Sequence, residues 1–409
     1  MDILFIHQNM PAQFKHLAPA LAASGKHRVV FVTRGKGVDI PGVRCVGYEA
    51  PRPANPTTHH YVRLYEASVR YGQQVARTLL QLKREGFVPT IVIGHPGWGE
   101  MMFVRDVFPR AVILSYAEFY YHGAGADVGF DPAQPADLDT VCRTRARNAH
   151  LLLSLDMADA GIAPTEWQRS RHPEIYQPRI RTIFDGVETD VVKPDPAARF
   201  RLADGRTLSR QDEVITYVAR NLEPYRGYPS FIRALPAILA ARPEAQVVIT
   251  GGDQVSYGAP APEGRSWREQ MELEVPLTTG PYADRVHFTG KLSYANYLSL
   301  LRVSSVHTYL TVPFVLSWSF IEAMATGCVM VASDTAPVLE FLEPGINGHL
   351  VPFHDPAAIA DRIIGVLTDR GDHLRLRKAA RATVIGRCAL SVCLPRQMQL
   401  VEQLTGVSV

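Results

Sequence analysis

Short runs of almost entirely apolar residues recur along the chain, and longer stretches with helical spacing of apolar residues separate them. Such runs are typical of parallel β-strands covered on both faces, and the longer stretches are typical of amphipathic helices. In the first half, the pattern predicts strands at residues 1–7, 28–33, 90–94, 111–116 and 181–184 and helices at 14–23, 61–86 and 137–153. This alternation predicts an α/β fold built on parallel sheets.

The same alternation returns in the second half of the chain. It predicts strands at residues 214–218, 247–250, 285–289, 303–310 and 329–332 and helices at 317–326, 355–367 and 372–384. Residues 255–279, which are first rich in Pro and Gly and then acidic, are predicted to form a surface insertion. A chain of 409 residues is too long for one ordinary hydrophobic core. We therefore predict two Rossmann-like domains, residues 1–186 and 197–388, with a hinge that contains Pro194 and Pro196.

Composition narrows the class of protein. With 46% hydrophobic and 20% charged residues and a formal net charge of +3, the chain is typical of a globular protein and does not favour a nucleic-acid partner. Its five cysteines form no CxxC pair, which favours reduced thiols and a cytoplasmic location. We expect no signal peptide, because the chain enters a strand directly, and no membrane span, because no run of eighteen apolar residues occurs.

A basic stripe lies on the long helix predicted at residues 61–86. Arg63, Arg70, Arg77 and Arg84 recur every seven residues and therefore lie near one face. The stripe would suit peripheral contact with anionic lipid at the inner face of a membrane. We favour the simpler interpretation, a solvated helix face with Glu66 beside it.

The stretch from Val312 to Asp334 carries the first sign of a ligand site. It predicts a loop, a helix that begins near Ser317, and a buried strand after Gly327. A helix entered through Ser317, Trp318 and Ser319 would present free backbone N–H groups and its positive dipole end to a phosphate. Glu322, one turn further along, would then reach two sugar hydroxyls. Taken alone, the same pattern fits an ordinary buried helix.

A second group of residues follows the strands upstream. Arg220 and Arg226 lie in the loop after the strand at residues 214–218, and two guanidinium groups there could donate forked hydrogen bonds to one diphosphate. Gly252 follows the next strand, in a turn tight enough for a nucleotide to approach the backbone.

Together these motifs resemble the retaining, nucleotide-sugar-dependent glycosyltransferases of family four. The family's phosphate-binding Arg and the Lys-Gly six residues on match Arg220 and Arg226-Gly227, with Arg in place of Lys, and its E-A-M-A-x-G helix matches residues 322–327. The resemblance implies the GT-B architecture, two Rossmann-like domains facing across a cleft, with a last helix, residues 390–409, packing back on the N-terminal domain. It also implies that the backbone at Leu292 pairs with the nucleotide base.

Polar residues beyond two strand ends of the N-terminal domain form a further group of candidates. Ligands of open parallel sheets bind beyond the carboxyl ends of the strands. His95 follows the strand at 90–94, and Glu118 and His122 follow the strand at 111–116. The resemblance implies a functional histidine in the second loop, and either Glu118 or His122 fits that place. His95 is a further candidate for catalysis.

The chain departs from the family pattern at two places. The loop after the first strand has no glycine, and we expect its polar residues Gln8, Asn9 and Gln13 to take over the donor contact. Eight residues before Glu322, where the family usually carries a glutamate that touches the donor sugar, stands Phe314. We interpret Phe314 as a subfamily trait.

The leading hypothesis is a retaining hexosyltransferase that moves a sugar from a nucleotide diphosphate, with UDP favoured, to a surface-polysaccharide or glycolipid acceptor. The two arginines would take the place of a metal ion, so no metal or other cofactor is expected. A sugar-nucleotide epimerase of the same architecture is the first alternative, with His95, Glu100, Glu118 and His122 as acids and bases. A catalytically degenerate partner subunit is the second, motivated by Phe314.

Overall fold

The computed structural model describes the whole chain, residues 1–409, as two compact units. The N-terminal unit contains residues 1–186 and 390–409, and the C-terminal unit contains residues 187–389. Each unit has a parallel sheet with helices on both faces, so the predicted fold class of two Rossmann-like α/β domains is confirmed.

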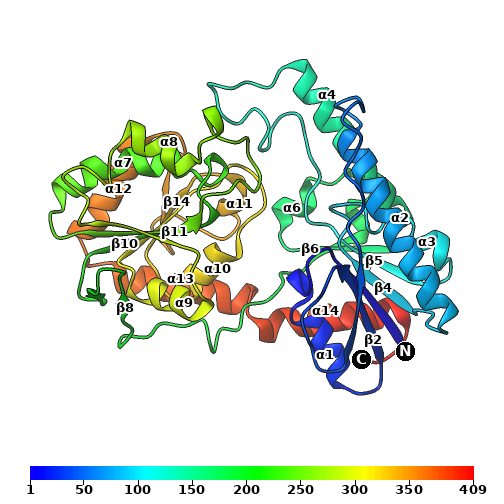
Figure 1. The fold of residues 1–409 in the computed structure, drawn as a ribbon. Helices are drawn as coiled ribbons and strands as arrows, with labels where there is room; N and C mark the ends of the chain where they lie inside the picture. Colours follow the sequence, from blue (N-terminus) through cyan, green and yellow to red (C-terminus); the bar gives the residue numbers. More distant parts are fainter. The chain divides into compact units, whose positions relative to one another are not determined.

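The N-terminal unit is built on a seven-stranded parallel sheet of order β3-β2-β1-β4-β5-β6-β7. Its strands are β1 (Asp2–Ile6), β2 (Arg28–Arg34), β3 (Val43–Tyr48), β4 (Ile91–Gly94), β5 (Val112–Tyr116), β6 (Ala160–Ala163) and β7 (Ile180–Thr182). Its helices are α1 (Leu17–Ala23), α2 (Arg63–Arg84), α3 (Val104–Val107), α4 (Leu138–Arg147), α5 (Ala149–Met157), α6 (Glu166–Ser170) and α14 (Leu390–Thr405). Helices α1 and α14 lie together on one face of the sheet, and α2 and α3 lie on the other (Figure 1).

Strand β1 marks the place where this sheet changes direction. It pairs with β2 through Asp2 and Arg28 and with β4 through Ile3 and Ile91, so the chain order runs outward from β1 on both sides. The carboxyl ends of such a strand pair are where open parallel sheets bind ligands. The residues after β1 and β4, His7 and His95, therefore stand at the favoured place for a site.

The helix predicted at residues 137–153 is in fact two helices, α4 and α5. Asp137 caps α4 by accepting a hydrogen bond from the Thr140 N–H, and the break falls at Asn148. The Asn148 side chain exchanges two hydrogen bonds with the backbone of Tyr121, at 3.0 and 2.7 Å. The break between the two helices is therefore fixed to the segment that follows β5.

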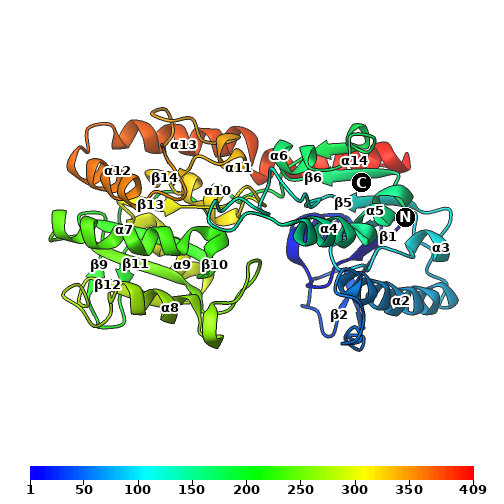
Figure 2. The ribbon, with the colours of Figure 1, turned by 90° about the horizontal axis from the view of Figure 1, so that it is seen from above.

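The C-terminal unit is built on a six-stranded parallel sheet of order β12-β11-β10-β13-β14-β15. Its strands are β10 (Val214–Asn221), β11 (Gln246–Gly252), β12 (Val286–Gly290), β13 (Val306–Tyr309), β14 (Met330–Ser333) and β15 (His349–Val351), beside a small hairpin of β8 (Phe200–Arg201) and β9 (Thr207–Leu208). Its helices are α7 (Tyr228–Ala241), α8 (Trp267–Glu274), α9 (Tyr294–Val303), α10 (Trp318–Ala325), α11 (Ala336–Leu339), α12 (Pro356–Thr368) and α13 (His373–Arg387). Helix α7 packs beside α12 and α10 beside α13, on opposite faces of the sheet (Figure 2).

None of the helices combines the length and the apolar character needed to cross a bilayer. Helix α2 carries the predicted basic stripe, but part of it is engaged within the protein. Arg63 donates hydrogen bonds to the Pro56 and Thr58 carbonyls, and Arg70 pairs with Glu66 four residues before it. Arg77 and Arg84 are exposed and make no such contact.

Buried histidines predict that the fold loses stability in mild acid. Burial lowers the pKa of His150 and His172 to about 4 and that of His307 to about 3, and it holds the pKa of His7 well below 6.5. Each group binds a proton less readily in the folded than in the unfolded chain, so this stability is fully present above pH 6.5 and falls as the pH falls from there toward 4. For one histidine, a pKa of about 4 against 6.5 corresponds to about 3 kcal/mol.

Urea unfolding at pH 7.5, 6.5 and 5.5 measures this loss above the range in which carboxylates titrate. We expect the urea midpoint to fall with pH, and His150→Gln to reduce that dependence. The exposed His354 offers a matched control, because His354→Gln should leave the dependence as it is. A midpoint that does not change between pH 7.5 and 5.5 would contradict the prediction.

Candidate functional site

Two arginines of the C-terminal unit flank the end of β10 in different environments. Arg220, the residue before the last of β10, is exposed and makes no hydrogen bond or ion pair. Arg226 is buried, and its Nη1 donates to the hydroxyls of Tyr309 and Thr311, at 3.1 and 2.7 Å, and to the Val315 carbonyl at 3.1 Å. Burial works to lower the pKa of Arg226, but the surrounding tyrosines outweigh it and the pKa is raised. Arg226 is therefore a cation fixed inside the protein, and Arg220 is a free cation at its surface.

The start of helix α10 differs from the sequence-based expectation. The Ser317 N–H donates to the Tyr309 hydroxyl at 2.9 Å, and the Ser319 N–H donates to the Ser317 hydroxyl at 3.3 Å. The expected free donors at Ser317 and Ser319 are thus already engaged, because Tyr309 ends the neighbouring strand and Ser317 caps its own helix. Trp318 is half-buried at the first position of the helix.

Glu322 is a buried carboxylate with both oxygens in use. It exposes 7% of its surface, and it accepts hydrogen bonds from the hydroxyls of Tyr294, at 2.7 Å, and Tyr297, at 2.8 Å. Both tyrosines belong to α9 and were not identified as candidates, since nothing in their spacing marks them. Tyr294 is half-exposed, so its contact with Glu322 lies where the carboxylate is closest to solvent. Burial, with Glu322 as the next cause, raises the pKa of both tyrosines and keeps them as donors.

Gly252 and Leu292 lie at the ends of the next two strands. A Cβ on Gly252, the last residue of β11, would stand 2.6 Å from Asn221 Oδ1 and 2.7 Å from Lys291 Cε, so a side chain here would have to displace these two side chains. Leu292, two residues after the end of β12, is half-buried, and its side chain packs against the apolar core of the unit. The ends of β10, β11 and β12 thus carry the predicted Arg220, Gly252 and Leu292 in succession.

In the N-terminal unit, two histidines at neighbouring strand ends form the centre of a polar cluster. Nδ1 of His7 accepts from the Asn9 N–H at 2.8 Å, and Nδ1 of His95 accepts from the Gly97 N–H at 3.0 Å. The two rings lie 5.0 Å apart. The other ring nitrogen of His95, Nε2, lies 3.3 Å from Glu118 Oε2.

Glu118 is held from three directions. Besides His95, the Gln13 amide donates to its Oε1 at 2.9 Å, and the Gln168 amide donates to its backbone carbonyl at 2.8 Å. Burial works to raise the pKa of Glu118, but the nearby His95 and the hydrogen bond from Gln13 outweigh it, and the pKa is lowered. The side chain is still 31% exposed, so a fixed carboxylate reaches the surface of the site.

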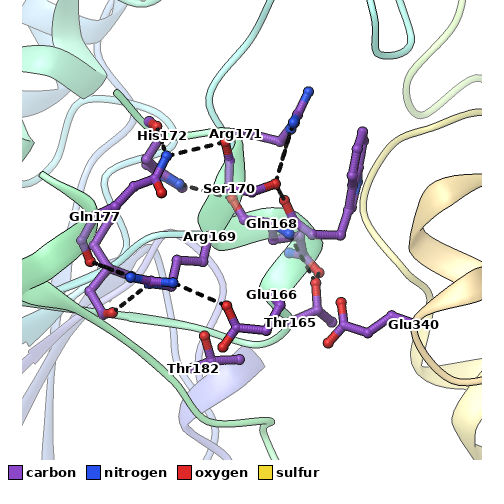
Figure 3. A network of polar contacts seen from close by, with 12 residues as sticks. Thr165, Glu166, Gln168, Arg169, Ser170, Arg171, His172, Gln177, Thr182 and Glu340 are labelled. Carbon is purple, nitrogen blue, oxygen red and sulfur yellow. Dashed lines mark hydrogen bonds and ion pairs between the residues drawn. The ribbon is translucent and has the colours of Figure 1, made fainter. Parts of the chain in front are cut away.

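The support for Glu118 comes from a network around the short helix α6 (Figure 3). Thr165 caps this helix by accepting from the Gln168 N–H at 3.0 Å, and Arg169 donates to the carbonyls of Gln177 and Ile180. His172 Nδ1 contacts the Gln168 carbonyl at 3.0 Å. These contacts hold the backbone of Gln168, and its side-chain amide in turn holds the Glu118 carbonyl.

The other candidates of this unit have different surroundings. His122 Nε2 lies 2.6 Å from the Arg171 carbonyl, to which it donates, so His122 is engaged outside the cluster. Gln8 and Gln13 face inward, toward Glu100 and Glu118, which leaves the exposed Asn9 as the member of that loop open to a donor. Glu100 is fully buried and accepts from Tyr48 and Gln8, so it is not accessible as an acid or base.

A hollow adjoins the polar cluster. Its lining includes His95, Tyr116, Glu118, Phe119, Tyr121 and Leu155. Its volume of about 30 Å³ has room for about one water molecule. The chain has no group of three or more His, Cys, Asp or Glu side chains arranged to hold a metal ion.

Comparison with known families supports a relation in both halves of the chain. Residues 25–192 match the family described as glycosyl transferase family 4 group, and residues 202–383 match glycosyl transferases group 1. Phosphatidyl-myo-inositol mannosyltransferase of Mycolicibacterium smegmatis is 30% identical over 214 residues, which are 51% of this chain and 49% of that protein. D-inositol 3-phosphate glycosyltransferase of Streptomyces scabiei is 28% identical over 232 residues, which are 54% of this chain and 48% of that protein. The match thus spans about half the length of these curated relatives.

Solved structures extend the likeness in fold to the whole chain. Sucrose-phosphate synthase from Thermosynechococcus elongatus has a TM-score of 0.68 at 20% sequence identity, with both chains covered over 100% of their length. Anabaena HepE, in complex with UDP and glucose, has a TM-score of 0.67 at 15% identity, also with 100% of both chains covered. At these identities the likeness shows the fold alone.

Proposed function

The chain belongs to the family 4 glycosyltransferases, as its motifs predicted, and we propose that it transfers a sugar from a nucleotide diphosphate to an acceptor. One observation carries this proposal. Arg220, free and exposed, lies next to last in β10, the buried and charged Arg226 follows six residues later, and Gly252 ends the neighbouring strand β11. Two cations at one strand end are the groups that a leaving diphosphate needs.

The reaction follows from where charge develops. When the bond between the anomeric carbon and the β-phosphate oxygen breaks, negative charge accumulates on the diphosphate. Contacts from Arg220 and Arg226 strengthen as this charge forms, so they lower the barrier more than they stabilise the bound substrate. We propose that the two guanidinium groups do this without a metal ion, and that activity in excess EDTA equals activity without it.

In the N-terminal unit we propose that Glu118 is the group that meets the reacting sugar or the acceptor hydroxyl. Its support is the contact with His95 and the hydrogen bonds from Gln13 and Gln168, which together fix its orientation. We do not assign this role to His122, because its ring donates to the Arg171 backbone carbonyl, outside the polar cluster. We further propose transfer with retention of the anomeric configuration, which the NMR coupling constant of the product measures.

We favour a UDP-linked donor and a glycan or lipid-linked acceptor. The choice of uracil as the nucleotide base is supported by HepE, a protein of the same fold that was solved with UDP-glucose. The choice of a lipid-linked acceptor is supported by relatives named phosphatidyl-myo-inositol mannosyltransferase. Arg77 and Arg84 on α2, which have no partner, would suit a peripheral contact with a membrane that holds such an acceptor.

A panel of nucleotide sugars tests the function. We expect one of them to raise the melting temperature and to release its nucleoside diphosphate when glycan or lipid acceptors are added. A sugar nucleotide converted to its epimer without release would favour the epimerase alternative. Donor binding with no transfer to any acceptor would favour a degenerate partner subunit. The inaccessible Glu100 already weighs against the epimerase, which would need several exposed acids and bases.

A further inference from the structure

An aromatic cluster occupies the place where the family usually carries its first glutamate. Phe314, which exposes 5% of its surface, lies between β13 and α10. Its ring contacts those of Tyr225 and Tyr257, with centroids 5.6 and 5.2 Å away. Tyr225 and Tyr257 also stack on each other at 6.2 Å. These three residues are called the aromatic wall below.

The aromatic wall adjoins the arginine that we assign to the diphosphate. The Tyr257 ring lies 5.6 Å from Cζ of Arg226. Arg226 also donates to the carbonyl of Val315, the residue after Phe314, and Tyr225 is the residue before Arg226. A sugar attached to a diphosphate at Arg226 would therefore lie against this wall.

Tyr257 belongs to the stretch predicted to be a surface insertion, and the first part of this stretch does lie at the surface, held there by hydrogen bonds. The buried Glu223 carboxylate accepts from the N–H groups of Ser256, Tyr257 and Gly258, at 3.2, 3.0 and 3.0 Å. The Asn221 amide donates to the Ser256 hydroxyl at 2.7 Å. The loop is thus fixed to the end of β10. Tyr257 keeps its place although it is 40% exposed.

We propose that the aromatic wall selects a deoxyhexose as the donor sugar, one that lacks a hydroxyl on the carbon that faces the wall. This inference rests on the proposed function and names its donor class. A carboxylate at position 314 would accept hydrogen bonds from sugar hydroxyls, whereas the Phe314 ring and the face of the partly exposed Tyr257 ring are apolar. A hydroxyl desolvated against such a surface is left without a partner, while a methyl or deoxy carbon packs favourably.

The test compares pairs of donors that share a nucleotide and differ by one hydroxyl: UDP-glucose with UDP-6-deoxyglucose, GDP-mannose with GDP-6-deoxymannose, and dTDP-glucose with dTDP-6-deoxyglucose. Release of nucleoside diphosphate gives kcat/KM, and competition binding gives Kd. We expect the deoxy donor of the accepted pair to be preferred ~10-fold or more. Phe314→Glu should shift the preference toward the hexose, and Phe314→Leu, the matched apolar control, should not.

Phe314 is buried, so its charged variant has a risk of misfolding, which the melting temperature reports. Tyr257→Ala, at a partly exposed residue, keeps the test decisive and should reduce the preference for the deoxy donor. If the wild type prefers the hexose, or if Tyr257→Ala leaves the preference unchanged, the aromatic wall does not select the donor, and the proposed function still stands. No release from any of the six donors would overturn the proposed function together with the selection by the aromatic wall.

Discussion

Arg220→Ala should reduce kcat by ~10²-fold or more and leave the melting temperature unchanged, because the Arg220 guanidinium has no partner within the protein. Because Arg220 contacts no other group of the protein, it contributes little to the stability of the fold. A bound diphosphate would be its only partner. Its contact strengthens as the leaving group gains charge, so the loss falls on kcat more than on KM. Steady-state kinetics and a thermal melt of the same preparation measure both quantities.

Arg226→Ala should lose comparable activity and also destabilise the C-terminal unit. Removing its guanidinium leaves the Thr311 hydroxyl and the Val315 carbonyl without this donor, while the Tyr309 hydroxyl keeps only the Ser317 N–H, at a cost of about 1–3 kcal/mol. Arg201→Ala, at an exposed arginine of β8 in the same unit, is the matched control and should change neither quantity. Near-wild-type kcat in Arg220→Ala and Arg226→Ala would mean that the diphosphate is held elsewhere.

The difference between these two arginines could not be predicted from the sequence. Motif spacing places both arginines near the end of one strand. Whether Arg226 is buried depends on Tyr309 and Val315, which lie more than eighty residues later in the chain and accept its hydrogen bonds. The same holds for Glu118, whose partner Gln13 lies 105 residues away in the chain. Strand ends can be predicted from apolar runs, and they correctly indicated where polar chemistry gathers. The side chains that hold each group come from elements whose pairing a local pattern does not encode.

In the fold, too, the sequence pattern predicted some strands and missed others. Long apolar runs such as β1 and β10 were predicted within a few residues, because burial on both faces leaves a continuous pattern. Strands β3 and β6 were not predicted. The first is an edge strand with only one buried residue, and the second is short, with three small residues beside Ile162, so it carries little apolar signal.

Glu322→Ala should raise the donor KM and the Kd of the nucleoside diphosphate ~10-fold to ~100-fold, since a buried carboxylate is worth about 1.5–3 kcal/mol to the hydroxyls that it accepts. Each oxygen already accepts one tyrosine hydroxyl, and each has a further lone pair for a ribose hydroxyl. Loss of the carboxylate also leaves the half-buried Tyr297 hydroxyl without its acceptor, so the alanine variant should melt lower than wild type.

Two further variants separate binding from stability at Glu322. Glu322→Gln keeps the volume and one acceptor oxygen, so it should melt closer to wild type while binding the nucleotide more weakly. Tyr294→Phe removes a hydrogen bond from the half-exposed tyrosine and leaves the carboxylate in place, so it should alter nucleotide affinity much less. Isothermal titration with the nucleoside diphosphate measures Kd for all three variants. If Glu322→Gln binds as tightly as wild type, the carboxylate serves only to hold α9 against α10 through its tyrosines, and the ribose must find its acceptor at another strand end.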